Sequence, residues 1–283
     1  MRPRIVQADG QIGFYWATAA GRPTSLQALV SHPDEDEPDR LVATHLEALD
    51  DALIIAADRF GEILGGGRGP ADADERDELL ELHRTLDRLC FEYAAALRSA
   101  GLAPDLRAGK IVGTAALFSI RARQPLGLLG PAPLDSELDE PTLGVVGGFG
   151  EFQQVDPDKP WKGGRWVVRT EAGQRFPLTL SMLLFDSSGT NKEGARKEHR
   201  DALASVVDAA GLPDADPMAV TCALDWLLYD WLLAHRDGPD SAEIVFPRGY
   251  DDAAALVVSA AAASVAARAT FDPGLVLTPH RGG

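Results

Sequence analysis

Cysteine and clustered histidine, the residues that most often carry thiol and zinc chemistry, are scarce in this sequence. The two cysteines of the chain, Cys90 and Cys222, each lie in an apolar, helix-like stretch where a thiol behaves as a small buried hydrophobic group. Two such cysteines give no disulfide framework, so we expect a reducing compartment and a cytoplasmic location. The six histidines are far apart and have no His-x-x-x-His spacing, which argues against a zinc site.

Long hydrophobic runs are also missing. The longest apolar stretch, residues 253–267, is 15 residues long and consists largely of alanine. A membrane-spanning helix needs about 20 strongly apolar residues. The stretch therefore predicts a close-packed core helix, and we expect no membrane association.

Basic residues are in the minority. The 27 Lys and Arg residues are outnumbered by 43 Asp and Glu residues, which gives a formal net charge of −16 at pH 7. Nucleic acids and anionic membranes select basic surfaces, because neutralising phosphates supplies most of the affinity. The charge therefore argues against non-specific nucleic-acid binding.

Amphipathic helices account for much of what the sequence does contain. Apolar residues recur with helical periodicity in residues 40–64 and again after an Asp72 or Asp74 cap, and we expect these two helices to form an antiparallel hairpin. The second helix is expected to stop at Gly101, because glycine adopts the left-handed cap easily and Pro104 follows. Further helices are predicted over residues 192–210, 217–235 and 250–270.

Short apolar runs separated by Gly and Pro replace the helical pattern over residues 109–185. We interpret these runs, and a further run at the N-terminus, as strands. The predicted strands and hairpins lie in residues 4–18, 110–122, 143–154, 166–171 and 174–184. Successive strands with no helices between them favour an antiparallel or mixed sheet.

The predicted fold class is therefore α+β. A central antiparallel or mixed sheet, made of about residues 109–185 and the N-terminal hairpin, would pack with an N-terminal helical hairpin and a C-terminal set of helices. We expect residues 1–283 to form a single domain, with the helical hairpin 40–101 as a semi-independent lobe.

A strand, a polar loop and a helix follow one another in residues 178–200. The apolar strand 178–185 leads into a loop that holds small hydroxyl residues and a glycine, and the next helix carries several cations in its first turns. Backbone N–H groups of such a loop, at a helix N-terminus, can bind an anion. In a molecule of charge −16, this local positive patch predicts a phosphoryl- or carboxylate-binding site.

Each residue of this segment has an expected role. Asp186 would act as the catalytic base or would hold a divalent metal such as Mg²⁺. The loop residues that would cradle the ligand are Ser187, Ser188, Gly189 and Thr190. The ligand-binding side chains of the helix would be Lys192, Arg196, Lys197 and His199. The alternative is an ordinary polar connection whose charges are solvated, some of them paired with Glu193, Glu198 and Asp201.

The predicted helix 217–235 is apolar almost all round, so we expect it to be buried. Its two carboxylates are costly there unless they are paired. Asp225 and Asp230 diverge by about 140° on an ideal helix, so they do not form one acid pair. Asp225 aligns with Tyr229 and Arg236, which favours a structural hydrogen bond or ion pair, although a functional role stays open.

Two functional hypotheses follow. In the first, the protein binds or transforms a phosphorylated small molecule or nucleotide at the strand–loop–helix site. In the second, it is a non-catalytic acidic interaction protein, either a subunit of an assembly or the partner of a basic protein. The second rests on the lack of a complete catalytic motif and on the faster encounter of an acidic surface with basic partners. An enzyme whose site is built from residues distant in the sequence is a third reading.

Overall fold

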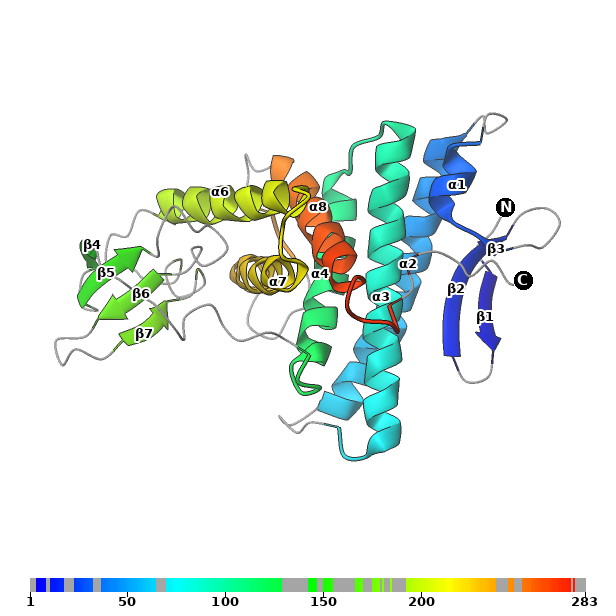
Figure 1. The fold of residues 1–283 in the computed structure, drawn as a ribbon, viewed down its shortest axis with the longest axis horizontal. Coiled ribbons are helices and arrows are strands. Elements are labelled where there is room, and N and C mark those ends of the chain that lie inside the picture. The colour runs from blue at the N-terminus through cyan, green and yellow to red at the C-terminus, as the bar shows by residue number, and fades with distance from the viewer. Residues whose placement is uncertain are drawn as a thin grey trace. The chain divides into compact units, whose positions relative to one another are not determined.

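The chain divides into two compact units (Figure 1). Unit 1 consists of Met1–Leu129 together with Arg248–Gly283, and unit 2 is Gly130–Pro247. This division does not test the expected single domain, which stays a prediction. The computed structural model describes residues 4–8, 11–17, 23–32, 37–64, 70–128, 142–146, 150–154, 166–169, 175–178, 180, 184, 192–237, 244–246, 251–275 and 277.

Unit 1 is a bundle of long helices with a small sheet. Its elements are β1 (Arg4–Ala8), β2 (Gln11–Ala17), β3 (Pro23–Thr24), α1 (Leu26–Val30), α2 (Pro38–Leu64), α3 (Ala73–Ala100), α4 (Leu106–Arg123) and α8 (Asp251–Arg268). α3 packs against α2, α4 and α8, and α4 also packs against α2 and α8. The strands pair antiparallel in the order β1-β2-β3, with Ala8 opposite Gln11, which confirms the predicted N-terminal hairpin.

The antiparallel hairpin of α2 and α3 is confirmed, and its ends show why the sequence revealed it. The Asp72 side chain accepts a hydrogen bond from the backbone N–H of Glu75 and so caps the start of α3. Gly101 follows the last turn with φ 66°, and the N–H of Leu102 donates to the carbonyl of Leu97 at 2.9 Å. This left-handed glycine cap satisfies carbonyls that the helix itself leaves without partners.

Residues 110–122 are helical, so their interpretation as a strand is wrong. They form most of α4, which begins after Asp105, whose carboxylate accepts from the N–H of Ala108 at 2.7 Å. Most side chains of α4 beyond its first turn are buried, since α2, α3 and α8 pack against it. Only a narrow stripe, with Lys110, Thr114 and Arg121, stays partly or fully exposed, so the amphipathic period is weak, and a short apolar run of that kind cannot be told from a strand by pattern alone.

The expected α+β fold with a central sheet is also wrong. Among the described residues, the buried apolar side chains lie almost entirely on helices, and the strands belong to two small separate sheets, one in each unit. Residues 110–122, which were expected to belong to the central sheet, form α4 instead. The protein is therefore predominantly helical.

Unit 2 combines a small sheet with a pair of helices. Its elements are β4 (Thr142–Val146), β5 (Gly150–Gln154), β6 (Trp166–Arg169), β7 (Arg175–Leu178), α6 (Lys192–Ala210) and α7 (Pro217–Ala234). The strands pair antiparallel in the order β4-β5-β6-β7, and α6 packs against α7. The predicted hairpin of β6 with β7 and the predicted helices 192–210 and 217–235 are confirmed. The strand expected over 178–185 is wrong where it is described, because β7 ends at Leu178 and both Leu180 and Leu184 are helical.

Candidate functional site

The loop of the predicted anion site lies outside the described residues. This applies to Asp186, Ser187, Ser188, Gly189 and Thr190, so their roles stay predictions. The helix that follows begins at Lys192, as predicted. The structure therefore places only the helical half of the site: Lys192, Arg196, Lys197 and His199.

Two of these cations pair with carboxylates of their own helix. Lys197 Nζ lies 2.9 Å from Asp201 Oδ2, and both side chains are more than half exposed. Arg196 Nη1 lies 3.6 Å from Glu193 Oε2. Pairs of this kind, three or four residues apart, stabilise an isolated helix slightly and cancel much of its local positive charge. The arrangement resembles the alternative of a polar connection with paired charges more than a free cationic patch.

His199 does not share the surface with Lys197. Its ring is 1% exposed, its Nε2 donates to the carbonyl of Leu227 at 2.8 Å, and it stacks on Trp231 of α7. Its Nδ1 lies 3.9 Å from a carboxylate oxygen of Asp230. The side chain therefore ties α6 to α7, and a role for His199 in binding a ligand stays a prediction.

The two buried carboxylates of α7 differ in what they contact. Both oxygens of Asp230 accept from the backbone N–H of Leu180, at 3.0 and 3.2 Å, so Asp230 holds the chain that follows β7 against α7. Asp225 is 2% exposed and lies on the same helix. Satisfied hydrogen bonding of this kind is the ordinary condition for a buried carboxylate, and it supports a structural role for Asp230.

A second imidazole lies close to this group. His235, at the end of α7, is 4% exposed, and its Nδ1 donates to the carbonyl of Trp231 at 2.8 Å. Burial lowers the pKa of His235 to about 4; the Trp231 carbonyl opposes this shift and the charge of Arg196 adds to it. The imidazole is therefore neutral at physiological pH, and together with His199 and Trp231 it forms a packed aromatic group.

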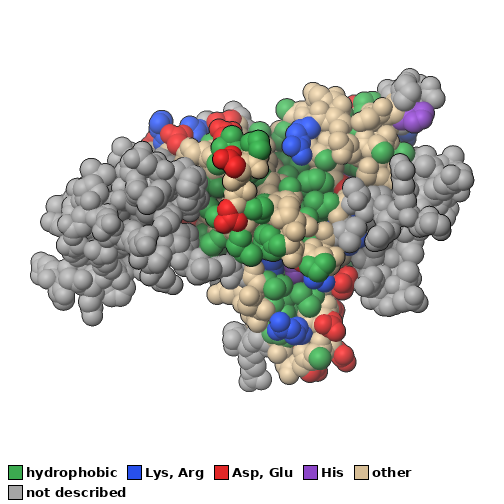
Figure 2. Space-filling view, viewed as in Figure 1, with side chains coloured by type: hydrophobic (Ala, Val, Ile, Leu, Met, Phe, Trp, Pro, Cys, Tyr) green, Lys and Arg blue, Asp and Glu red, His purple; other side chains and the backbone are tan. Residues whose placement is uncertain are grey.

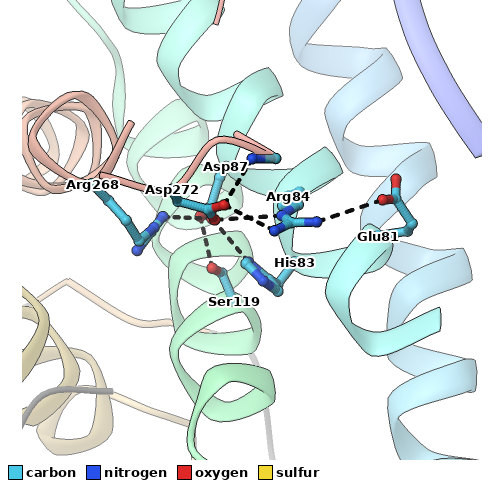
Figure 3. Close-up of polar contacts among 8 residues, drawn as sticks. Glu81, His83, Arg84, Asp87, Ser119, Arg268 and Asp272 are labelled. Carbon is cyan, nitrogen blue, oxygen red and sulfur yellow. Dashed lines mark hydrogen bonds and ion pairs between the residues drawn. The ribbon is translucent and has the colours of Figure 1, made fainter. Parts of the chain in front are cut away.

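The most connected polar group of unit 1 lies between α3, α4 and α8 and surrounds Asp87 (Figure 3). Ser119 of α4 donates its hydroxyl to Asp87 Oδ1 at 2.7 Å, and His83 Nδ1 lies 3.2 Å from Oδ2. Arg268, in the last turn of α8, donates Nη2 to the same Oδ2. His83, Asp87, Ser119 and Arg268 are each at most 4% exposed. The sequence analysis missed them because each stands alone in its own segment.

Charge fixes the protonation of this cluster. Burial alone would raise the pKa of Asp87, but the guanidinium of Arg268, the His83 hydrogen bond and the charge of Arg123 hold it well below its usual range. Burial, with the charges of Arg123 and Arg268, lowers the pKa of His83 despite its bond to Asp87. Asp87 is thus an anion, and neutral His83 must carry its hydrogen on Nδ1 to donate to it.

The chemistry of the cluster is structural. The hydroxyl hydrogen of Ser119 is directed at Asp87 rather than at a base that could remove it, so Ser119 is not set up as a nucleophile. The neighbouring Cys90 is fully buried, and burial followed by the charge of Asp87 raises the pKa of its thiol, which makes it unreactive. The cluster therefore joins three helices through one buried carboxylate.

Two further polar ties secure the ends of unit 1. Arg84 Nη2 donates to Asp272 Oδ1 at 2.8 Å, which holds the turn after α8 against α3 (Figure 3). Trp16 of β2 donates its indole N–H to His45 Nδ1 at 2.9 Å, and His45 Nε2 donates to the carbonyl of Leu89 at 3.0 Å. Through this chain of hydrogen bonds the N-terminal sheet is fixed to α2 and α3.

The outer face of α2 takes no part in these buried polar contacts. Its exposed positions from Ala43 to Glu62 follow a helical spacing and are Ala43, Glu47, Asp51, Ile54, Ile55, Asp58, Gly61 and Glu62. The side chains of Glu47, Asp51 and Asp58 make no hydrogen bond or ion pair with any described residue, whereas Glu62 pairs with Arg59. Arg59, the one base of this stretch, is also bound at 2.6 Å by both oxygens of Glu78.

The end of unit 1 where α2 ends and α3 begins is visible in Figure 2. In Figure 2, acidic side chains lie there beside Lys and Arg, so charges of both signs are mixed. On the outer stripe of α2 the fully exposed charged positions between Ala43 and Glu62 are acidic. The one Lys or Arg of this stretch, Arg59, has a side chain that is 42% exposed and is paired with Glu62 and Glu78. The sequence offered a signal for the outer stripe: Ile54 and Ile55 fall outside the buried apolar stripe of the helix, between acidic residues.

Searches for other kinds of site were negative within the described part of the chain. No group of three or more His, Cys, Asp or Glu side chains there could hold a metal ion. No helix among those residues is long and apolar enough to cross a membrane. No family model, no curated protein and no solved structure matches the chain.

Proposed function

We propose that this protein is a non-catalytic, acidic interaction protein that binds a basic protein partner through the outer face of α2. The observation that carries the proposal is the row of Glu47, Asp51 and Asp58, which are exposed and make no pair with a described residue. Their spacings of four, seven and eleven residues place them on one side of the helix, so a partner can contact them together. Neither Cys90 nor Cys222 is in a disulfide, which agrees with the cytoplasmic location that we include in the proposal.

Electrostatics favours a basic partner over the alternatives. The net charge of −16 repels nucleic acids and anionic membranes and attracts cationic surfaces over distances of about a Debye length. Buried charged groups such as Asp87 are fully used in joining helices, as described above. An acidic surface of this kind raises the association rate and gives it a strong dependence on salt.

The test is a charge-reversal experiment with a matched control. The protein is titrated with an acetylated, amidated 21-residue peptide rich in lysine, and the affinity is measured at several salt concentrations. Glu47→Lys/Asp51→Lys/Asp58→Lys should abolish most of the binding. Asp77→Lys/Asp208→Lys/Asp214→Lys changes the net charge equally, at exposed positions elsewhere, and should retain it. Equal losses in both variants would contradict the proposal, because only net charge would then matter.

A phosphorylated ligand remains the second candidate, for one reason. Lys192 and Arg196 lie one turn apart on the same side of α6, at the helix start that was predicted to face the loop. A ligand present at 100 times its dissociation constant adds about 2.7 kcal/mol, enough for a shift of a few degrees in Tm. A thermal-shift screen of nucleotides, sugar phosphates and inorganic phosphate, with and without Mg²⁺, should show a shift that Arg196→Ala removes. No shift with any of them would end this candidate.

A further inference from the structure

Ile54 and Ile55 form an exposed apolar pair in the middle of the acidic face of α2. Their side chains are 61% and 51% exposed, although α2 buries eleven other side chains, including Leu53 and Ala56 on either side. A single exposed hydrophobic residue needs no explanation, but adjacent ones with charged neighbours mark many interaction sites. This pair adds an apolar centre to what is otherwise a charged surface.

The order of residues along the face is acid, apolar pair, acid. Asp51 precedes Ile54 by one turn and Asp58 follows it by one turn, and Asp51 and Asp58 also lie one turn from Ile55 on either side. A protein interface commonly has this layout, with apolar anchors at its centre and charges at its rim. The face thus has the pattern that receives an amphipathic helix.

We infer that the element docked on α2 is a basic amphipathic helix, with apolar side chains that cover Ile54 and Ile55 and with Lys or Arg at either side of them. This inference rests on the proposed function. Asp58 lies seven positions after Asp51, a distance of about 10.5 Å along the axis at the helical rise. A helix packed alongside matches this distance with cations seven positions apart and apolar residues three and four positions after the first cation.

Charge argues against the other occupants of this face. A second copy of the chain, docked by the same surface, would bring Glu47, Asp51 and Asp58 opposite an equal set of carboxylates. An anionic membrane or nucleic acid meets the same repulsion. A partner with both basic and apolar side chains can form favourable contacts with the acidic residues and with the apolar pair.

Two peptides of equal charge test the inference. One is an acetylated, amidated 21-residue helix built on Lys-x-x-Leu-Leu-x-x-Lys; in the other, each Leu is replaced by Gln. The wild-type full chain should bind the Leu peptide about tenfold or more tightly than the Gln peptide, because interface anchors of this size contribute at least that factor. Ile54→Ser/Ile55→Ser should remove the difference. Since both side chains are exposed, this variant should fold with an unchanged Tm.

The control removes exposed apolar side chains elsewhere. Leu212→Ser/Met218→Ser replaces residues that are 58% and 54% exposed in unit 2, and it should preserve the preference for the Leu peptide. If the Ile54→Ser/Ile55→Ser variant keeps the preference for the Leu peptide, the inference is overturned. The proposed function is still supported in that case if charge reversal of α2 abolishes binding of both peptides. If the wild type binds neither peptide, both the inference and the proposed function are overturned. A wild-type dimer in sedimentation that the Ile variant dissociates would identify a second copy as the occupant and would overturn the inference.

Discussion

Asp87 is the residue on which α3, α4 and α8 converge. It accepts hydrogen bonds from His83, Ser119 and Arg268 in the interior of unit 1. Removing one partner of a buried ion pair leaves the other charge uncompensated, which costs about 3–5 kcal/mol. We therefore expect Asp87→Ala to lower the free energy of unfolding by about that amount in a urea titration.

Two further variants distinguish the cost of an unpaired buried charge from the cost of a lost hydrogen bond. Ser119→Ala removes one hydrogen bond to Asp87 and should cost about 1.5–3 kcal/mol. Asp87→Ala/Arg268→Met replaces both charges with apolar side chains, and such replacements are often neutral. The double variant should be more stable than Asp87→Ala alone. If Asp87→Ala is as mild as Ser119→Ala, the carboxylate is not the centre of the cluster.

His45 gives the stability of the protein a dependence on pH. Burial lowers its pKa from 6.5 to about 4, an effect that its bond to the Leu89 carbonyl only partly offsets. Between these values the unfolded chain binds a proton at His45 and the folded protein does not, so stability falls as the pH drops from 6.5 towards 4. Protonation would also remove the Nδ1 acceptor that Trp16 uses.

The measurement is the free energy of unfolding of the wild type and of His45→Gln at pH values between 4.5 and 6.5. We expect a shallower pH dependence in the variant, by up to about 1.4 kcal/mol per pH unit, whatever its overall stability. Glu92 acts in the opposite direction: burial raises its pKa to about 7, so its contribution is lost as the pH rises through that value. Glu92 and His235 contribute equally to the pH dependence of both proteins, so their contributions cancel when the two curves are compared. Parallel curves would show that His45 does not control this window.

At the scale of elements, Gly101 and Gly211, each directly after a helix, make a matched pair. Gly101 ends α3 with φ 66°, where an L side chain is strained, whereas Gly211 follows α6 without a positive φ. A Cβ at Gly211 would lie 3.4 Å from the carbonyl oxygen of Asp208, an ordinary contact. The similar sequences around them, Ala-Gly-Leu, therefore do not imply the same cap.

We expect Gly101→Ala to destabilise the protein by about 1 kcal/mol and Gly211→Ala to be neutral or slightly stabilising. Thermal or urea unfolding of both variants under the same conditions measures the difference. Equal effects at the two sites would mean that the left-handed cap at Gly101 does not contribute to stability.

The helices also show what the sequence could and could not predict. α2 and α3 each keep one polar face, so their period, caps and antiparallel pairing were readable. α4 keeps only a narrow polar stripe because three helices pack against it, and its Ala- and Gly-rich run was mistaken for a strand. Its helical state depends in part on contacts with α2 and α8, which are not its neighbours in the sequence.

The site was predictable only in part for a related reason. The start of α6 at Lys192 was foreseen from local signals, but the burial of His199 depends on α7 and was not. The cluster around Asp87 joins residues up to 181 positions apart, so no local pattern reveals it. The acidic face of α2, in contrast, is a property of one helix, and a helical reading of residues 43–62 suffices to find it.

At the scale of the whole molecule, unit 1 is built from both ends of the chain, and unit 2 is inserted between α4 and α8. The contact of α8 with α3 and α4, strengthened by Arg268 and by the Arg84–Asp272 pair, closes unit 1 after the insertion. The proposed interaction surface lies on α2 in unit 1, and the candidate anion site lies on α6 in unit 2. A binding experiment on the full chain can therefore tell the two apart by location.

Hydrogen–deuterium exchange of the full chain, with and without the Lys/Leu peptide at saturating concentration, tests the central claim most directly. Docking on the outer face of α2 should slow exchange in fragments that cover residues 43–62, because a covered helix opens less often. Fragments from the start of α6 should be unchanged. Slower exchange confined to α6, or no change anywhere at saturation, would contradict the assignment of α2 as the binding surface.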